Sequence, residues 1–207
     1  MSQGERLSAR LRAAVADERV LAAIALLPRE RFVPAAQRDR AYDNVALPIA
    51  CDQTISQPLV VARMLELLEL KGTDRVLDVG TGSGYHAALL AMLAGEVWTI
   101  ERHQKLSEQA QRTITELGID NVHFVCGDGA DGLAQQSPFD AINVAAAVGE
   151  RVPVALEQQL ALGGRLVAPL GDTDQRLVRV VRTPTGCWTE RLESVRFVPL
   201  IRGAVGD

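Results

Sequence analysis

The sequence predicts an α/β protein with a doubly wound, mostly parallel sheet, helices on both faces and a closing antiparallel strand pair. From residue 75 to residue 169, short apolar runs alternate with stretches of helical spacing. Parallel strands need crossovers of this kind, and such crossovers are right-handed. A glycine-rich turn, DVGTGSGY, follows the first apolar run, and two β-rich stretches joined by Pro-Thr-Gly end the pattern. These observations together indicate a Rossmann-like fold.

The amino-terminal third is predicted to be helical with a long irregular segment in its middle. Apolar residues recur at three- and four-residue intervals from Leu7 to Leu27, which predicts one helix ended by Pro28. Residues 29–57 have no sustained period and contain prolines and turn formers, so we expect them to wrap over the rest of the protein. A second helix is expected from about Pro58 to about Leu68, with Gly72 as its carboxy-terminal cap.

The remaining elements follow from apolar runs and helical periodicity. Five parallel strands are expected at 75–79, 97–100, 122–125, 141–145 and 165–169, with helices over 87–93, 105–117 and 154–160. Residues 176–181 and 190–197 are predicted to form the closing antiparallel pair.

Composition excludes several classes of partner and location. The 207 residues are 47% hydrophobic and 23% charged, with a net charge of −4, which provides no overall attraction to nucleic acid or to anionic lipid. No apolar stretch approaches the 18 residues typical of a membrane span. Three cysteines without CxxC spacing indicate neither a disulfide framework nor a zinc site. We therefore expect a cytoplasmic protein without a nucleic-acid or membrane partner.

The turn after the first strand of the core indicates a bound nucleoside. Ligands of open parallel sheets bind at the carboxyl ends of the strands, where the strand order reverses. The turn DVGTGSGY resembles the dinucleotide fingerprint GxGxxG, but Tyr85 stands where the last glycine would be required. A nucleoside without phosphates therefore fits the turn better than a pyrophosphate does.

The next two strand ends suit an adenosine. Glu101 ends the second strand, where its carboxylate can accept hydrogen bonds from both hydroxyl groups of a ribose. Gly127-Asp128-Gly129 ends the third strand, and Asp128 can accept a hydrogen bond from an exocyclic amine. A tight turn without a ligand and a nicotinamide cofactor remain as alternatives.

Several segments resemble one family. DVGTGSGY, Glu101 and the Asp128 loop resemble the class I S-adenosylmethionine-dependent methyltransferases. Within that class, the segment ALPIACDQTISQP at 46–58 resembles the signature loop of the protein-L-isoaspartate O-methyltransferases. The same resemblance is carried by RFVP at 31–34, GDG at 127–129 with PFD at 138–140, QQL at 158–160 with GG at 163–164, and RFVPL at 196–200. It extends from about Pro28 to Leu200.

The resemblance implies a repair activity. A monomer would transfer the methyl group of S-adenosyl-L-methionine to the α-carboxylate of L-isoaspartyl residues in damaged peptides and unfolded proteins. A carboxylate is ionised at neutral pH, so it needs no general base, and the rate can come from alignment and desolvation. Two alternatives stay open: a methyltransferase that acts on another carboxylate, and a module that binds S-adenosylmethionine without catalysis.

The resemblance also assigns site residues. Ser56 is implied as the catalytic residue, positioning the carboxylate through hydrogen bonds; its alternative role is to cap the helix that begins near Pro58. The cofactor would be bound by Gln53, Thr54, Ile55, Asp78, Gly80, Gly82, Ser83, Gly84, Glu101, Arg102, Asp128 and Gly129. Gln175 matches a family position near the ligand. No metal is expected.

The family pattern divides a single domain, residues 1–207, into three parts. These are a helical and substrate-loop segment (1–72), a cofactor-binding α/β core (73–171) and closing strands (172–207).

Three residues near the motifs need separate interpretation. Asp52 stands where family members usually carry glycine; aspartate tolerates a left-handed backbone, but its charge would oppose an anionic substrate if it pointed into the pocket. His86 is expected on a helix surface, with a place beside the cofactor as the alternative. Cys51 is expected to be a packing residue.

Overall fold

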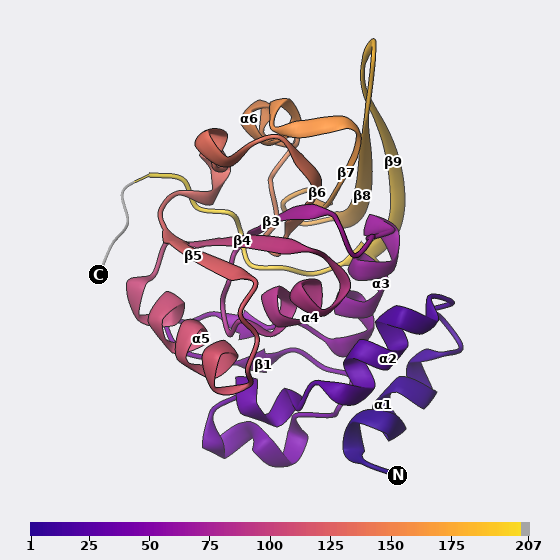
Figure 1. Ribbon diagram of the computed structural model, residues 1–207, viewed down its shortest axis with the longest axis vertical. Coiled ribbons are helices and arrows are strands. Elements are labelled where there is room, and N and C mark those ends of the chain that lie inside the picture. The colour runs from indigo at the N-terminus through magenta and orange to yellow at the C-terminus, as the bar shows by residue number, and fades with distance from the viewer. Residues whose placement is uncertain (204–207) are drawn as a thin grey trace.

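A seven-stranded mixed sheet forms the centre of the protein (Figure 1). The computed structural model describes residues 1–203, so residues 204–207 of the predicted closing segment lie outside it. The strand order is β5-β4-β3-β6-β7-β8-β9. The five parallel strands are β3 (Arg75–Val79), β4 (Glu96–Glu101), β5 (Val122–Cys126), β6 (Phe139–Val144) and β7 (Leu160–Leu170). Strands β8 (Gln175–Thr183) and β9 (Gly186–Val195) are antiparallel, which confirms the predicted fold class and the closing pair.

The strand order reverses at β3. This strand pairs with β4 on one side and with β6 on the other, and Val79 lies level with Ile100 and with Val144. The connections from β3 and from β6 therefore leave in opposite directions across the sheet. The crevice that this arrangement creates lies at the carboxyl ends of β3, β4 and β6, as expected for a doubly wound sheet.

The helices cover the two faces unequally. One face carries α3 (Pro58–Leu68), α4 (Tyr85–Leu93) and α5 (Gln104–Glu116). Helices α1 (Gln3–Leu11) and α2 (Glu18–Leu26) pack outside them (Figure 1). The other face carries the short α6 (Val154–Gln158) and the 3-10 turns η3 (Gly129–Asp131) and η4 (Ala134–Gln136). Helix α4 is apolar on nearly all sides because it lies between the sheet and α2. None of the described helices is long and apolar enough to cross a bilayer.

The predicted single helix over residues 7–27 is wrong: the chain forms two helices, α1 (Gln3–Leu11) and α2 (Glu18–Leu26). Asp17 caps α2 by accepting hydrogen bonds from the backbone N–H groups of Arg19 and Val20. The carboxylate of Glu66 on α3 accepts from the N–H groups of Ala16 and Asp17, which fixes the turn. The apolar period runs through the break because both helices bury a face in the same core.

The predicted cap at Gly72 is also wrong. Helix α3 ends at Leu68, and its cap is Glu69, a non-glycine residue with φ of 47°. Arg165 of β7 donates from Nε to the Leu68 carbonyl at 2.7 Å and from Nη2 to the Glu69 carbonyl at 2.8 Å. Because an arginine from the sheet satisfies the last carbonyls, the helix needs no glycine at its end.

The segment between α2 and α3 is irregular, as predicted, with short local structure. It contains η1 (Arg29–Phe32), η2 (Ala35–Arg40) and a hairpin of β1 (Leu47–Pro48) and β2 (Thr54–Ile55). The hairpin turn places two non-glycine residues, Cys51 and Asp52, at φ of 57° and 54°. Such a pair of positive φ angles is typical of a type I′ turn, which favours glycine and asparagine.

After β9 the chain crosses back over the carboxyl ends of the parallel strands (Figure 1). The Ala147 N–H donates to the Val198 carbonyl and the Leu200 N–H donates to the Ala147 carbonyl, both at 2.8 Å. Farther along, the Gly203 N–H donates to Asp128 Oδ2 at 2.7 Å. The segment Val198–Gly203 is called the C-terminal strap below.

Candidate active site

A pocket opens at the carboxyl ends of β3, β4 and β6, where the strand order predicts it. Its walls come from separate parts of the chain: residues 53–56 with β2, the glycine turn with the start of α4, the end of β4, and the C-terminal strap. Smaller contributions come from Val61 of α3, Gly129 after β5, and Ala145 and Ala146 after β6. It is called the strand-end pocket below. Predicted site residues that line it are Gln53, Thr54, Ile55, Ser56, Gly80, Gly82, Ser83, Glu101, Arg102 and Gly129.

Three predicted cofactor residues, Asp78, Gly84 and Asp128, do not line this pocket. Asp78 is fully buried beneath the glycine turn, where it accepts hydrogen bonds from Asn143 Nδ2 at 2.7 Å and Thr99 Oγ1 at 2.8 Å. Burial raises the pKa of Asp78 to about 7. Its position under the turn indicates that it supports the pocket floor.

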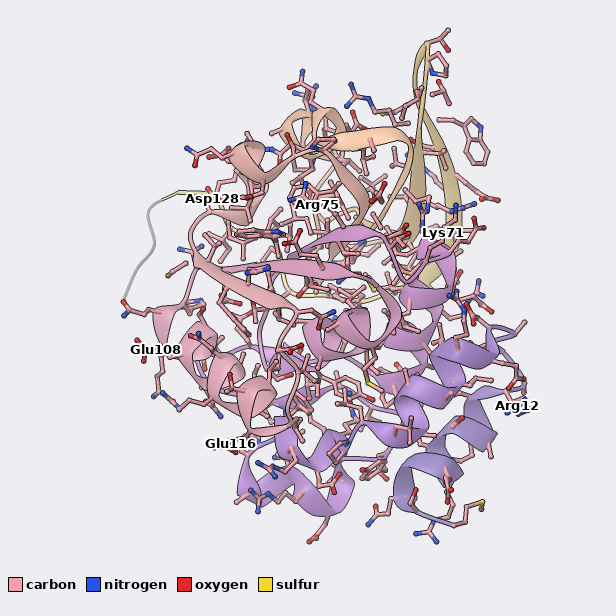
Figure 2. All side chains as sticks on the ribbon, in the orientation of Figure 1. Arg12, Lys71, Arg75, Glu108, Glu116 and Asp128 are labelled. Atoms are coloured by element: carbon pink, nitrogen blue, oxygen red, sulfur yellow. The ribbon has the colours of Figure 1, made fainter. Side chains whose placement is uncertain are left out.

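The other two have local structural roles. Gly84 has φ of 87°, and a Cβ there would lie 2.9 Å from the Cβ of Ala110, so the glycine lets α4 and α5 pack closely. Asp128 caps η3 by accepting from the Ala130 N–H, and its second oxygen accepts from Gly203. Figure 2 shows Asp128 beside the C-terminal strap.

Glu101 is held rigidly at the end of β4. The residue is 6% exposed, Oε2 accepts from the Gly82 N–H at 2.9 Å, and Oε1 accepts from the His103 N–H at 3.0 Å. The glycine turn is thus tied to the acidic strand end. A carboxylate with one edge fixed by two backbone donors can still accept from ligand hydroxyl groups, since each oxygen has two lone pairs.

The alternative role of Ser56 as a helix cap is wrong. The N-cap position of α3 is held by Gln57, which makes no side-chain capping hydrogen bond, and Pro58 occupies the first helical position. Ser56 instead lines the strand-end pocket and also a second cavity of about 900 Å³. This second cavity, the groove, runs between α3 and the end of β9. The two cavities share Thr54, Ser56, Ala145 and Val198.

A buried arginine holds the backbone of Ser56. Arg29 is completely buried; Nη2 donates to the Ser56 carbonyl at 2.7 Å and Nε to the Ala41 carbonyl at 2.8 Å. Its guanidinium carbon lies 4.6 Å from the centre of the Tyr85 ring, at the start of α4. One cation therefore connects the signature loop with the helix that follows the glycine turn.

Asp52 and Gln175 lie outside both cavities. Asp52 is exposed in the hairpin turn, so its charge does not face the substrate region. Gln175 is buried and holds the residue that precedes the strap: Oε1 accepts from the Phe197 N–H at 2.6 Å, and Nε2 donates to the Phe197 carbonyl at 3.1 Å. Its role is therefore to place the strap over the pocket.

The expectation of a surface histidine at position 86 is wrong. His86 is 6% exposed and lines the strand-end pocket, as the alternative had it. Burial, with a smaller contribution from the charge of Arg29, lowers the pKa of His86 to about 3. The helix is covered by α2 and the amino-terminal segment, which a periodicity argument on α4 alone does not show.

Sequence reasoning missed Arg29, Ala145 and most of the strap. A signal existed for the strap in the RFVPL resemblance, whereas Arg29 is followed by the charged Glu30 and Arg31 and has no local signal of burial. Ala145 directly follows β6, the strand beside the reversal point, and could have been found from topology. In residues 1–203, no group of three or more His, Cys, Asp or Glu residues could hold a metal ion.

The lining fits S-adenosylmethionine. Glycine at position 82 has φ of 52°, and a Cβ there would meet Ile49 at 3.7 Å, so the turn lies against the signature loop with its backbone facing the pocket. A fixed carboxylate at Glu101 suits a ribose, and the buried Nε2 of His86 has no hydrogen-bond partner in the described part of the chain. A buried polar atom without a partner, beside a carboxylate that can accept further hydrogen bonds, is expected where a ligand binds.

Comparisons with known proteins agree with this geometry. The model of the protein-L-isoaspartate(D-aspartate) O-methyltransferase family matches residues 3–204. The chain is 49% identical over 189 residues to protein-L-isoaspartate O-methyltransferase of Vibrio atlanticus, covering 91% of this chain and 90% of that one. It is 51% identical over 205 residues to protein-L-isoaspartate O-methyltransferase 1 of Rhodopseudomonas palustris, covering 97% and 83%.

Solved structures give the same result. One protein-L-isoaspartate O-methyltransferase superposes with a TM-score of 0.87 at 30% identity, over 98% of this chain and 67% of that chain. A putative enzyme of the same name from Plasmodium falciparum, in complex with S-adenosyl-L-homocysteine, superposes with a TM-score of 0.84 at 25% identity, over 98% and 100%.

Proposed function

This chain belongs to the protein-L-isoaspartate(D-aspartate) O-methyltransferase family, and from that premise we propose how its pocket and groove divide the work of methyl transfer. The enzyme uses S-adenosylmethionine to methylate the α-carboxylate of L-isoaspartyl residues, the first step of protein repair. The strand-end pocket holds the cofactor, and the groove holds the peptide that carries the damaged residue.

The observation that carries this division is the position of Ser56. It lines both cavities, with Thr54, Ala145 and Val198 as the other shared residues. A group transferred from a ligand in the pocket to a ligand in the groove has to pass this wall. A serine hydroxyl there can donate a hydrogen bond to a carboxylate oxygen and fix its direction of approach.

Ser56 acts as a positioning donor in this reaction. S-adenosylmethionine, when bound, supplies an electrophilic methyl group on a sulfonium sulfur, which becomes a neutral thioether as the carboxylate oxygen forms its bond to the methyl carbon. Arg29 fixes the Ser56 backbone, so the hydroxyl is held in place before the substrate arrives. Ile55 and Val61 are buried apolar neighbours that exclude water from the carboxylate.

The cofactor's parts follow the strand ends. Glu101 accepts hydrogen bonds from the ribose hydroxyls, and Gly129, with Leu200 and Ile201 of the strap, encloses the adenine. The glycine turn, Gly80 to Ser83, faces the sulfonium and the amino-acid end. Asp78 supports the turn from below without contacting the ligand.

Replacing Ser56 with Ala tests the assignment. We expect kcat on an L-isoaspartyl peptide to fall on the order of tenfold to a hundredfold, because an aligned donor is lost. The Kd for S-adenosylhomocysteine should change less than twofold, since Ser56 acts on the acceptor. The readout is labelled methyl transfer to twin peptides that differ only in L-isoaspartyl or L-aspartyl.

Ser137 provides the matched control. It lies outside both cavities and donates to the Ala134 carbonyl, so Ser137→Ala should leave methyl transfer unchanged. Unchanged kcat in Ser56→Ala, or equal labelling of the two wild-type peptides, would contradict the proposed division of labour.

The acceptors, oligomeric state and location are part of the same proposal. The acceptors are damaged or unfolded chains, because a flexible segment can enter the groove; the enzyme is a monomer in the cytoplasm without a nucleic-acid or membrane partner. The net charge of −4 supports the absence of a nucleic-acid or anionic-membrane partner. Light scattering at working concentration tests the monomeric state, and fractionation of cells tests the cytoplasmic location.

A further inference from the structure

His86 is a buried polar residue in the strand-end pocket whose role remains unassigned. It lies in the first turn of α4, is 6% exposed, and lines the pocket with Ser56 and Ser83. Its Nε2 atom is buried, and none of residues 1–203 provides it with a hydrogen-bond partner. A buried polar atom without a partner is costly unless a ligand or a water satisfies it.

The topology indicates which end of the cofactor His86 faces. Glu101 ends β4, and Gly129 follows β5, so the adenosine is placed on the β4–β5 side of the pocket. Helix α4 follows β3, so Tyr85 and His86 of its first turn line the pocket on the β3 side, away from the β4–β5 side assigned to the adenine. His86 therefore faces the amino-acid end, which carries one carboxylate and one ammonium group.

The local charge selects the carboxylate. Arg29 places a buried guanidinium next to the start of α4, close enough to affect the protonation of His86. The amino terminus of the nine-residue α4 adds the positive end of a helix dipole at the same place. Burial lowers the pKa of His86 to about 3, so the imidazole is neutral and adds no charge of its own. A positive field attracts a carboxylate and repels an ammonium group.

We propose that His86 is a cofactor-binding residue whose Nε2–H donates a hydrogen bond to the methionyl carboxylate of S-adenosylmethionine. The contact rests on the proposed cofactor site. It satisfies a buried imidazole nitrogen that residues 1–203 leave without a hydrogen-bond partner. It also distinguishes the whole cofactor from thioether nucleosides that lack the amino-acid end.

Three ligands separate this contact from a packing role. S-adenosylhomocysteine has the carboxylate and the ammonium group, decarboxylated S-adenosylhomocysteine has only the ammonium group, and 5′-methylthioadenosine has neither. Kd values are measured by calorimetry for wild type, His86→Leu and His86→Gln. We expect His86→Leu to raise the Kd for S-adenosylhomocysteine on the order of tenfold. Binding of the other two ligands should change less than twofold, and His86→Gln should recover most of the loss through its amide N–H.

His123 is the matched control, because it lies on β5 outside the pocket, stacked on Trp98 and paired with Glu96. His123→Gln should leave all three Kd values unchanged. If His86→Leu does not fold, His86→Met removes the donor with a more flexible side chain.

The results separate failure of this contact from failure of the site. Equal weakening of S-adenosylhomocysteine and 5′-methylthioadenosine, or no weakening of either, overturns the contact. If Glu101→Ala nevertheless weakens the binding of S-adenosylhomocysteine and of 5′-methylthioadenosine, the proposed cofactor site stands without the His86 contact. If wild type binds neither ligand, the proposed site fails and the contact fails with it.

Discussion

Asp52 occupies a backbone position that suits glycine better. Its φ of 54°, next to Cys51 at 57°, lies in the left-handed region, where an L side chain is strained by about 1 kcal/mol or more. Aspartate tolerates this region better than most residues, which explains how the hairpin keeps its shape. The carboxylate is exposed and lines neither cavity.

Replacing Asp52 with Gly should therefore change stability and leave catalysis alone. We expect the free energy of unfolding to rise by roughly 0.5–1 kcal/mol as the strain is released. The KM for an isoaspartyl peptide should stay the same. Urea unfolding and initial rates measure the two quantities. Asp39→Gly in η2, which has no positive φ, should not stabilise; a lowered KM in Asp52→Gly would show that the charge reaches the substrate.

Asp78 makes stability depend on pH. Its pKa is about 7 in the folded protein, against an ordinary value of 3.8, because burial disfavours the charge. The folded state thus binds the proton more tightly than the unfolded state does. The stability that the protonated carboxyl contributes is complete below pH 3.8 and is lost as pH rises to about 7, by at most about 1.4 kcal/mol per pH unit.

Asp78→Asn should remove that dependence. Relative to wild type, the variant should become more stable as pH rises from 5 to 8, because Asn does not titrate. Urea unfolding of both proteins at several pH values gives the difference. A difference that is the same at pH 5 and pH 8 would show that Asp78 does not titrate in this range.

The sequence predicted the position of single site residues correctly where the residue type and its place at a strand end or turn already define its role. Glu101 and the glycine turn were found because a strand end and a backbone turn restrict their chemistry locally. His86 and Arg29 could not be placed, since the burial of each depends on elements far away in the sequence. The local sequence around an arginine or a histidine does not indicate which distant element will bury the side chain.

At the scale of elements, Gly4 sets how closely α1 and α2 pack. A Cβ at Gly4 would lie 2.4 Å from the carbonyl oxygen of Ala25, which is too close for any real contact. We expect Gly4→Ala to lower the free energy of unfolding by about 1–2 kcal/mol, since the overlap outweighs the helix propensity of alanine. Chemical denaturation measures the change.

Gly72 is the matched control for this substitution. Nothing lies within 4 Å of a Cβ there, and its φ is not positive, so Gly72→Ala should change stability by less than about 0.5 kcal/mol. If the two substitutions change the free energy of unfolding equally, Gly4 is not needed for the close packing of α1 on α2.

Periodicity predicted well the elements that pack against other regular secondary structure. The strands β3, β4, β5 and β6 were expected near their observed positions, and in β3 and β6 burial on both faces gives a nearly unbroken apolar run. Strand β7 begins at Leu160, five residues before the expected start, and α6 ends at Gln158 instead of residue 160. The break at residues 12–17 and the end of α3 were missed. Both are fixed by side chains from other elements, Glu66 and Arg165, which satisfy backbone groups that local sequence leaves open.

At the scale of the whole molecule, the active site belongs to no single segment. The strand-end pocket takes residues from 53–56, 61, 79–83, 85–86, 100–103, 129, 145–146 and 198–201. Sequence motifs marked the groups at 53–56, in the glycine turn, at the end of β4 and at 129. The strap was not expected over the pocket, because its path depends on where β9 ends and on the clamp at Gln175. Distant segments meet only through the completed sheet.

A pocket assembled in this way should couple ligand binding to folding of the entire chain. We expect one cooperative transition in urea, with the same midpoint for the fluorescence of Trp98 in β4 and for far-UV circular dichroism, in a Trp188→Phe background. S-adenosylhomocysteine at 100 times its Kd should raise the free energy of unfolding by about 2.7 kcal/mol, by the same amount with either probe. Trp188 is exposed on β9, so its replacement should cost little. A dichroism transition that precedes the fluorescence change would show that residues 1–72 unfold separately, and then the ligand would stabilise only the α/β core.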